Sequence, residues 1–270
     1  MLISMSGSGP RRNGRRKGQQ LALHDASGQA PALKERKRRK RRRGTKLGRP
    51  ASGERQGFVA HRARETHDER HPVHVSMRRV RLAPSLREER VYRAIVLQLV
   101  RAKRSGVRVV HYDVQDNHLH LIVEGKDRED LSSQMRKLFS RIALAANYVA
   151  QRRGALFRDR HHRQELRSPR QTRNALLYVL FNDRKHHAQN GGAIDRAFFA
   201  SLDERSSIAW LPDRAWTEAR PPPEEVARLR ARYEIEGEAP IVHATTWLAN
   251  VGWYERGGGR LSLHELPRLI

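Results

Sequence analysis

The sequence reads Gln115-Asp116-Asn117-His118-Leu119-His120-Leu121-Ile122-Val123-Glu124 near the middle of the chain. In a strand, alternate side chains point to opposite faces, so His118 and His120 would share one face while the aliphatic residues beside them turn towards a core. Two imidazoles side by side on one strand form half of a metal site, because neutral imidazole is a common metal ligand. The alternative is a strand with two histidines turned to solvent, since this short pattern is weak by itself.

Apolar patterns on both sides of this run predict further strands and two helices. Residues 71–78 alternate in polarity and residues 107–114 are rich in Val, which indicates a strand in each case. Apolar residues at helical spacing follow the first and the third strand, and residues 156–166 are placed to supply a fourth. The order strand, helix, strand, strand, helix, strand predicts an α+β, ferredoxin-like split βαβ domain, an antiparallel sheet with both helices on one face.

Residues at the ends of these two helices predict their bounds. Ser85 with Glu88 three residues later forms a capping-box pattern, and Gly106 is placed to end the helix that starts there. Asp127 or Asp130 is expected to begin the second helix, since a carboxylate can accept the free backbone N–H groups of the first turn.

A third helix begins at Ser168-Pro169-Arg170-Gln171, which combines a Ser N-cap, Pro at the first helical position and Gln at the third. We expect it to run through Asn182. Asn174, Tyr178 and Asn182 would then lie one above another, a polar stripe on an otherwise apolar helix. The alternative is that Tyr178 is an aromatic residue at the edge of the core and that Asn182 only ends the helix.

The charge of the chain indicates a polyanionic partner. The 270 residues include 55 Lys and Arg against 29 Asp and Glu, a formal net charge of +26. Residues 1–50 hold 16 of the basic residues and two acidic ones, whereas residues 191–270 are slightly acidic. The centre of the chain is therefore basic as well, which favours a nucleic-acid surface on the domain that carries the histidines.

The composition also bounds the organisation of the chain. Residues 1–55 are rich in Gly, Ser, Gln and Arg without apolar periodicity, so we expect a disordered basic arm that either binds phosphates or is a solvated tail. The absence of cysteine excludes disulfides and thiolate zinc sites. No apolar run approaches the length of a membrane span and no secretory signal is evident, so we expect no membrane contact and a cytoplasmic protein.

Residues 191–270 are expected to form a C-terminal extension. It contains a Pro-rich linker, Pro221-Pro222-Pro223, a helix from Glu224, and the aromatic segment Thr246-Trp247-Leu248-Ala249-Asn250-Val251-Gly252-Trp253-Tyr254. One interpretation of that segment is aromatic stacking on unpaired bases. The other, favoured by the slight acidity of the extension, is a small Trp-containing module that packs against the preceding domain.

Together, a basic ferredoxin-like domain, His118-Leu119-His120 on a central strand, and Tyr178 with Asn182 four residues later resemble the single-tyrosine HUH transposases of bacterial insertion sequences, in particular their REP-associated tyrosine transposase branch. Asn117 before the histidines also matches, and His71-Pro72-Val73-His74-Val75 looks like the opening strand of the family. The resemblance covers residues 70–190, which would be the catalytic domain.

The resemblance implies a DNA transposase that cuts and rejoins single-stranded or hairpin DNA. Tyr178 would attack a phosphodiester and form a covalent 5′-phosphotyrosine intermediate, leaving a free 3′-hydroxyl. His118, His120 and Asn182 would hold a divalent metal, Mg or Mn. Family members include dimers that exchange the tyrosine helix and monomers that do not, so a homodimer is one of two alternatives.

Two rivals and one departure stay open. The first rival keeps the chemistry but is a host-adopted relative, a relaxase or a replication initiator. The second is a nucleic-acid-binding ferredoxin-like protein without chemistry. The departure is Gln115-Asp116 where the family has Met-Pro, which leaves Asp116 as an alternative neighbour of the ion.

Contacts to the DNA backbone are expected from basic side chains after the second helix. Arg158, Arg160 and Arg163 alternate on the fourth strand candidate, and His161 lies among them. The remaining histidines in basic surroundings are expected to face DNA or solvent rather than a metal; they are His111, His162, His186 and His187.

Overall fold

One four-stranded antiparallel sheet organises the part of the chain that the computed structural model describes, residues 65–267. The expected basic arm, residues 1–55, lies outside the described residues. In chain order the elements are β1 (Val73–Arg78), α1 (Glu89–Arg104), β2 (Arg108–Val114), β3 (His118–Glu124), α2 (Arg128–Val149), β4 (His162–Glu165), α3 (Pro169–Leu180), α4 (Asn182–Gln189), α5 (Arg196–Ala200), the short turns η2 (Ile208–Trp210) and η3 (Asp213–Ala215), α6 (Pro223–Tyr233), the π-helix η4 (Leu248–Gly252) and α7 (Trp253–Glu255).

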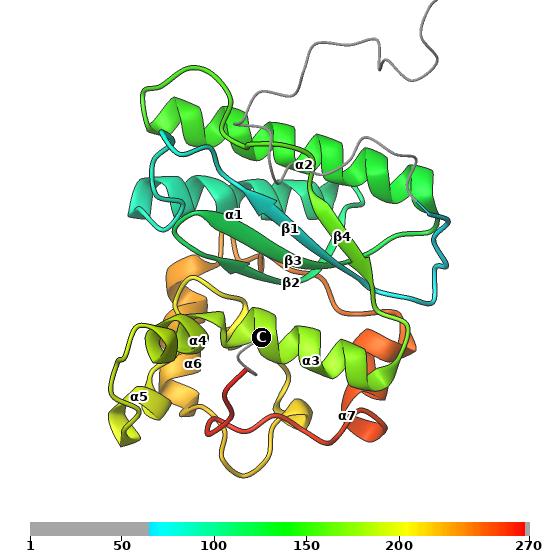
Figure 1. Cartoon of the computed structure of the whole chain (residues 1–270), viewed down its shortest axis with the longest axis vertical. Helices are drawn as coiled ribbons and strands as arrows, with labels where there is room; N and C mark the ends of the chain where they lie inside the picture. Colours follow the sequence, from blue (N-terminus) through cyan, green and yellow to red (C-terminus); the bar gives the residue numbers. More distant parts are fainter. Residues whose placement is uncertain (1–64, 268–270) are drawn as a thin grey trace, which may run out of the picture. The chain divides into compact units, whose positions relative to one another are not determined.

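The strands lie in the order β2-β3-β1-β4, and each neighbouring pair is antiparallel. The helices α1 and α2 cover one face of the sheet, and α3 lies across the other face (Figure 1). This is the ferredoxin-like split βαβ arrangement, so the predicted fold class is confirmed. The strand β3 lies between β2 and β1, in the middle of the sheet.

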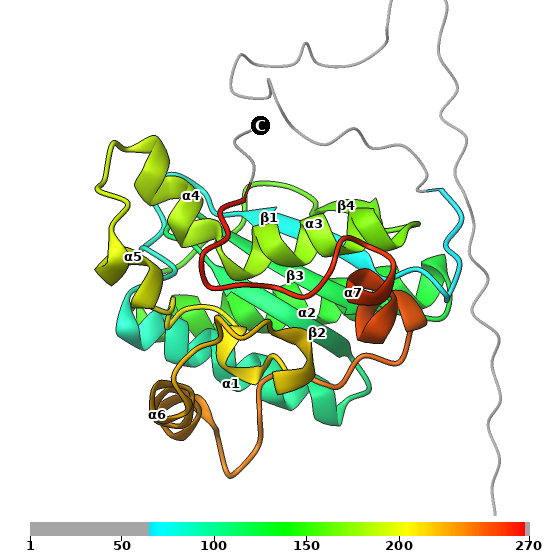
Figure 2. The same ribbon diagram turned by 90° about the horizontal axis from the view of Figure 1, so that it is seen from below.

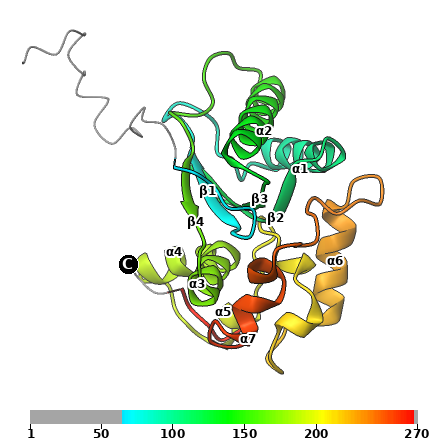
Figure 3. The same ribbon diagram turned by 90° about the vertical axis from the view of Figure 1, so that its right-hand side faces the viewer.

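The alternation of side chains in β3 determines what each face of the sheet carries. Leu119 and Leu121 lie opposite Met77 and Val75 of β1, and all four side chains are buried on the face that α1 and α2 cover. Burial of this apolar area stabilises the layer by about 25 cal/mol per Å². The two histidines of β3 therefore lie on the other face, towards α3. Figure 3 shows α1 and α2 on one side of the sheet and α3 on the other.

The bounds expected for α1 and α2 agree with the structure except at the start of α1. That helix begins at Glu89 rather than at Ser85, so the expected capping box is wrong. The Ser85 hydroxyl instead accepts the backbone N–H of Arg87, at 3.1 Å, and stabilises the turn before the helix. Gly106, with φ at 80°, ends α1 as expected. Asp127 caps α2 by accepting a backbone N–H of the first turn, which confirms the first of the two candidates.

The start of α3 is confirmed, but its expected continuation is wrong. Ser168 accepts the backbone N–H of Gln171 at 3.2 Å, and Pro169 is the first helical residue. The helix then ends just before Phe181, whose φ of −124° and ψ of 26° are not helical. Asn182 begins α4, so it does not continue the helix that carries the tyrosine.

Tertiary packing of Phe181 accounts for this break. Its side chain is fully buried, its ring lies 6.2 Å from that of Trp216, and the guanidinium carbon of Arg184 lies 4.3 Å from its centroid. Both partners lie outside α3, so the helical spacing of the sequence does not predict these contacts. The chain therefore turns at Phe181 and directs the next residue to the sheet.

The C-terminal extension packs against the same face of the sheet as α3 (Figure 2). The backbone N–H of Ser207 donates to the carbonyl of Tyr112 in β2, at 2.9 Å, and Trp253 is buried where α7 packs on α3. Pro223 opens α6, one residue before the expected start. Within residues 65–267, none of the helices combines the length and the apolar character that crossing a bilayer requires.

Candidate active site

His118 and His120 lie side by side on the face of β3 that α3 crosses. Their ring centroids are 4.5 Å apart, with the planes at 88°. His120 is 5% exposed, whereas His118 is only partly buried. The two imidazoles that the sequence places on one face of a strand therefore lie next to each other, with one edge of the pair open to solvent.

Tyr178 projects from α3 onto this pair. Its ring lies 5.1 Å from that of His120, with the planes at 84°, and 5.9 Å from the ring of His74 in β1. The Lys185 ammonium lies 4.9 Å from the tyrosine centroid. Tyr178 is half-buried, so its phenol belongs to the site while remaining accessible from outside.

The side chain of Asn182 contacts the sheet at β2. Its side chain is 1% exposed, and its Nδ2 donates to Oδ2 of Asp113 at 3.1 Å. Asp113 lies directly opposite His120 in the pairing of β2 with β3. Gln115 donates to both oxygens of the same carboxylate, at 2.9 Å each. The amide of Asn182 is thus held by the strand beside the histidines, with its oxygen directed away from Asp113.

Two buried atoms of this cluster have no hydrogen-bond partner among the described residues: His120 Nε2 and Asn182 Oδ1. The other ring nitrogen of His120, Nδ1, is bonded to His74 Nε2 at 3.1 Å, and His118 Nδ1 is bonded to the side-chain oxygen of Asn117. Such second bonds orient an imidazole for coordination through its remaining nitrogen. Buried polar atoms without partners are rare, so these two indicate a place for a further group.

The donor set could hold a divalent cation, and the expected Mg or Mn stays a prediction. Imidazole nitrogen and amide oxygen without thiolate are compatible with such ions. In the described part of the chain, no group of three His, Cys, Asp or Glu side chains is arranged to hold a metal. A third protein ligand would therefore have to be of another type, and the partnerless oxygen of Asn182 satisfies that condition.

The electrostatics keep the histidine rings neutral. Burial, followed by the neighbouring cations and imidazoles, lowers the pKa of His118 to about 4 and that of His120 well below its usual value. Burial likewise lowers the pKa of His74 to about 4. The pKa of Tyr178 is raised, first by burial and then by the Asp113 carboxylate, so the phenol carries its proton at neutral pH. Neutral rings can accept a proton or bind a cation, and the tyrosine must lose its proton to act as a nucleophile.

Sequence reasoning missed three members of the cluster: His74, Asp113 and Gln115. The signal for His74 was its place in an alternating strand, but only the register of β1 with β3 brings it beside His120. Asp113 lies in a Val-rich strand, where the sequence pattern gives no signal that it belongs to the site. The alternative neighbour of the ion, Asp116, instead bonds to Arg79 at 3.1 Å and is largely exposed at the turn.

The expected DNA-contacting residues lie elsewhere. The strand β4 spans only four residues, so Arg158 and Arg160 precede it and do not alternate on a strand as expected. Arg163 lies opposite Val75, which places it on the helix-covered side of the sheet. His161 is buried, with its ring 5.7 Å from that of Phe139. Contact with DNA stays a prediction for all four residues.

One further histidine differs from expectation. His111 is buried on β2, where Nδ1 is bonded to the Ser207 hydroxyl at 3.1 Å, so it faces neither DNA nor solvent. His186, from α4, lies near the open edge of the site, with its ring 6.1 Å from that of His118.

Comparison with known proteins gives a structural likeness and no match in sequence. No family model matches the chain, and no curated protein matches it either. Among solved structures, the chain is similar to a REP-associated tyrosine transposase bound to a REP hairpin, with 17% sequence identity and a TM-score of 0.39. The likeness covers 47% of this chain and 74% of that one.

Proposed function

We propose that the protein is a DNA transposase of the single-tyrosine HUH type, which cleaves and rejoins single-stranded or hairpin DNA. One observation carries the proposal: the Tyr178 ring lies 5.1 Å from that of His120, whose Nε2 is one of two buried polar atoms of the cluster that have no partner among the described residues. A nucleophile next to a partly assembled cation site is an arrangement that can serve phosphoryl transfer to a tyrosine.

The residues of the chain have separate roles in this reaction. The Tyr178 oxygen attacks the phosphorus and its proton passes to solvent; a bond forms between the tyrosine and the 5′ phosphate while the bond to the 3′ oxygen breaks, and that oxygen takes up a proton to become the 3′-hydroxyl. The Lys185 ammonium lies 4.9 Å from the centroid of the Tyr178 ring, where the aromatic face attracts it. The phosphotyrosine bond keeps the phosphoryl group as an ester, so a 3′-hydroxyl can reverse the step and rejoin strands.

His118, His120 and Asn182 would hold the Mg or Mn ion, through ring nitrogens and the amide oxygen. When bound, such an ion offsets charge on the non-bridging phosphate oxygens in the transition state. His74 and Asn117 orient the two imidazoles through their second ring nitrogens, and Asp113 orients the amide.

The rival without chemistry is less well supported. A ferredoxin-like domain that binds nucleic acid on its sheet presents that face openly with aromatic side chains. Here α3 and the C-terminal extension cover the face, and its central strand carries histidines instead. The net charge of the chain suits DNA as the partner under either alternative.

Covalent capture tests the proposal. The full chain is incubated with labelled single-stranded hairpin oligonucleotides and Mn, and denatured samples are searched for a protein–DNA adduct. We expect an adduct with the wild type, none with Tyr178→Phe, and an undiminished one with Tyr148→Phe, whose tyrosine is 77% exposed on α2. An adduct that forms equally well in the Tyr178→Phe variant would refute the assigned nucleophile.

A further inference from the structure

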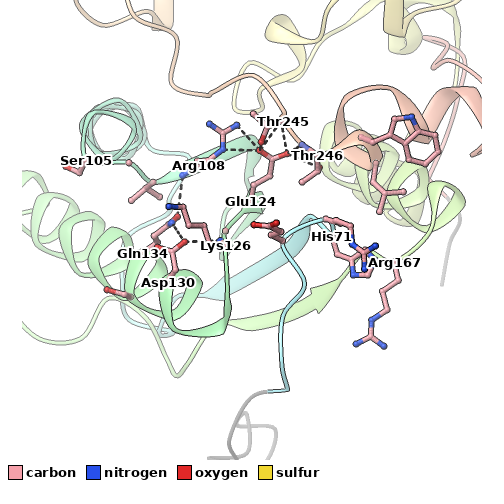
Figure 4. A pocket seen from close by; sticks show the side chains of 18 of the residues that line it. His71, Ser105, Arg108, Glu124, Lys126, Asp130, Gln134, Arg167, Thr245 and Thr246 are labelled. Carbon is pink, nitrogen blue, oxygen red and sulfur yellow. Dashed lines mark hydrogen bonds and ion pairs between the residues drawn. The ribbon is translucent and has the colours of Figure 1, made fainter.

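We propose that a cavity at the opposite end of β3 from the tyrosine site binds an unpaired nucleotide of single-stranded DNA. The inference rests on the proposed function only for the choice of DNA as the nucleic acid. The cavity measures about 1060 Å³ and is shown in Figure 4. Glu124 lies at its wall, at the last position of β3, and strand geometry places its Cα about 13 Å from that of His120. The cavity and the tyrosine site are therefore distinct.

The rim of the cavity carries cations that are available to a ligand. Lys126 and Lys137 line it and are exposed, and neither ammonium group forms a hydrogen bond or ion pair with the described residues. The three arginines of the lining, Arg70, Arg108 and Arg167, are each paired with a carboxylate. The two lysines are thus the groups on this wall that can bind phosphate without first breaking an ion pair.

Two of the three carboxylates in the lining already have hydrogen-bond partners. Glu124 is 3% exposed and accepts hydrogen bonds from Arg108 and from the backbone and hydroxyl groups of Thr245 and Thr246. Asp130 accepts the Lys126 backbone N–H and the Gln134 amide. The lining as a whole holds five Lys and Arg side chains against three carboxylates, those of Glu69, Glu124 and Asp130, so its net charge is positive.

An exposed aromatic ring completes the cavity. Trp247 is 46% exposed, although the residues around it are firmly anchored. Thr246 before it is bonded to the buried Glu124, and a Cβ on Gly252 would lie only 2.7 Å from the Trp247 ring, so the backbone packs directly beneath it. Trp247 is the N-cap residue of the π-helix η4, a rare element that is frequent at functional sites. A rigid, exposed indole beside free ammonium groups is suited to stack a base whose phosphate the lysines hold.

The two interpretations of the aromatic segment, stacking on bases and packing against the domain, apply to different tryptophans. Trp253 is buried against α3 and packs the extension onto the domain, whereas Trp247 faces solvent at the cavity. Stacking on Trp247 needs a base that is free of its neighbours, so the occupant is single-stranded; a duplex keeps its bases stacked inside.

The test measures binding without cleavage. The full-length Tyr178→Phe protein serves as the parent, and a short fluorescein-labelled single-stranded oligonucleotide of mixed sequence is titrated at several salt concentrations. We expect added Trp247→Ala to weaken binding about tenfold and added Trp247→Phe to retain it, since stacking on an aromatic ring is lost only in the first. Joint replacement of Lys126 and Lys137 by Ala should lower the slope of log affinity against log salt by about 1.4.

The matched control joins Arg101→Ala and Arg136→Ala, which remove two exposed cations from α1 and α2 outside the cavity. Equal losses in the control and the cavity variants would overturn the proposal, as would an equal loss of duplex binding in Trp247→Ala. Covalent capture with Tyr178 intact is scored separately. Cavity-dependent binding without any adduct would refute the proposed chemistry alone, whereas an adduct with cavity variants that bind like the parent would refute the cavity alone.

Discussion

The ring of Tyr178 stands edge-on to the ring of His120, with the centroids 5.1 Å apart and the planes at 84°. One residue comes from α3 and the other from β3, so the contact joins a helix to the strand at the middle of the sheet. Because His120 Nδ1 is already bonded to His74, the nitrogen left for a cation is Nε2. Nucleophile and cation site are thus in contact but chemically separable, and each can be removed alone.

Removal of the cation site should abolish cleavage and spare DNA binding. We expect His120→Ala to reduce adduct formation to background, and a chelator to do the same to the wild type, because both remove the charge that offsets the phosphate oxygens. Binding of single-stranded DNA should keep its salt dependence, since that affinity comes from cations elsewhere. His243→Ala, at an exposed histidine of the extension, is the control. Joint loss of binding and cleavage in a folded His120→Ala protein would favour the rival without chemistry.

Asp113 should raise the affinity for the metal because it orients the side-chain amide of Asn182. Its carboxylate accepts the Asn182 Nδ2–H, which leaves the amide oxygen free. In Asp113→Asn the new amide can present either end, so the oxygen of Asn182 loses its fixed direction. We expect Mn affinity, measured by calorimetry without DNA, to fall between about tenfold and a hundredfold. Asp116→Asn removes a carboxylate that bonds to Arg79 at the nearby turn and should leave Mn affinity unchanged; similar losses in both variants would contradict this role.

The parts of this site that the sequence predicts are local ones. Alternation in β3 places His118 and His120 on one face, and the pattern of Ser168 and Pro169 locates the start of α3. Each depends on residues a few positions apart, where helical or strand periodicity determines which side chains meet.

The parts that it does not predict depend on contacts between distant segments. The break at Phe181 follows from burial against Trp216, and His74 reaches His120 only through the register of β1 with β3. Ser85 shows that a local motif can also mislead. The spacing of Ser85 and Glu88 predicts a helix cap, but the Ser85 hydroxyl accepts a backbone N–H in the turn before the helix.

Burial of His111 should make the fold sensitive to acid. Burial lowers its pKa to about 4 from 6.5, against the opposite influence of the Glu124 carboxylate. The unfolded chain takes up the proton at the higher pKa, so this stabilisation is complete above pH 6.5 and is lost as the pH falls towards 4. The expected slope is about 1.4 kcal/mol per pH unit across that window.

Urea unfolding at a series of pH values compares the wild type with His111→Gln, which keeps a polar group near the Ser207 hydroxyl. The difference in unfolding free energy between the two proteins should shrink as the pH falls through the window, because only the wild type carries this histidine. Parallel stability curves for the two proteins would show that His111 does not titrate as its burial requires.

Glu124 should anchor the C-terminal extension to the sheet. Its buried carboxylate accepts the backbone and hydroxyl donors of Thr245 and Thr246 and pairs with Arg108 at 2.8 Å. In Glu124→Gln an amide N–H group meets donors where an oxygen accepted them, and the partner arginine loses its counter-charge. We expect a loss of about 2 to 3 kcal/mol in unfolding free energy, since hydrogen bonds to charged groups are the stronger ones.

Hydrogen exchange separates this anchor from a general loss of stability. The amides of Thr245 and Thr246 should lose protection in Glu124→Gln more than the amides of β1 do, and Trp247 should become more accessible to a fluorescence quencher. Glu129→Gln, which removes an exposed partner of Arg128 on α2, should change neither measurement. Uniform loss of protection across the sheet and the extension would mean that Glu124 supports the whole fold rather than the anchor. Loss of protection confined to Thr245 and Thr246 would instead show that Glu124 holds the segment next to Trp247, and so would link Glu124 to the cavity.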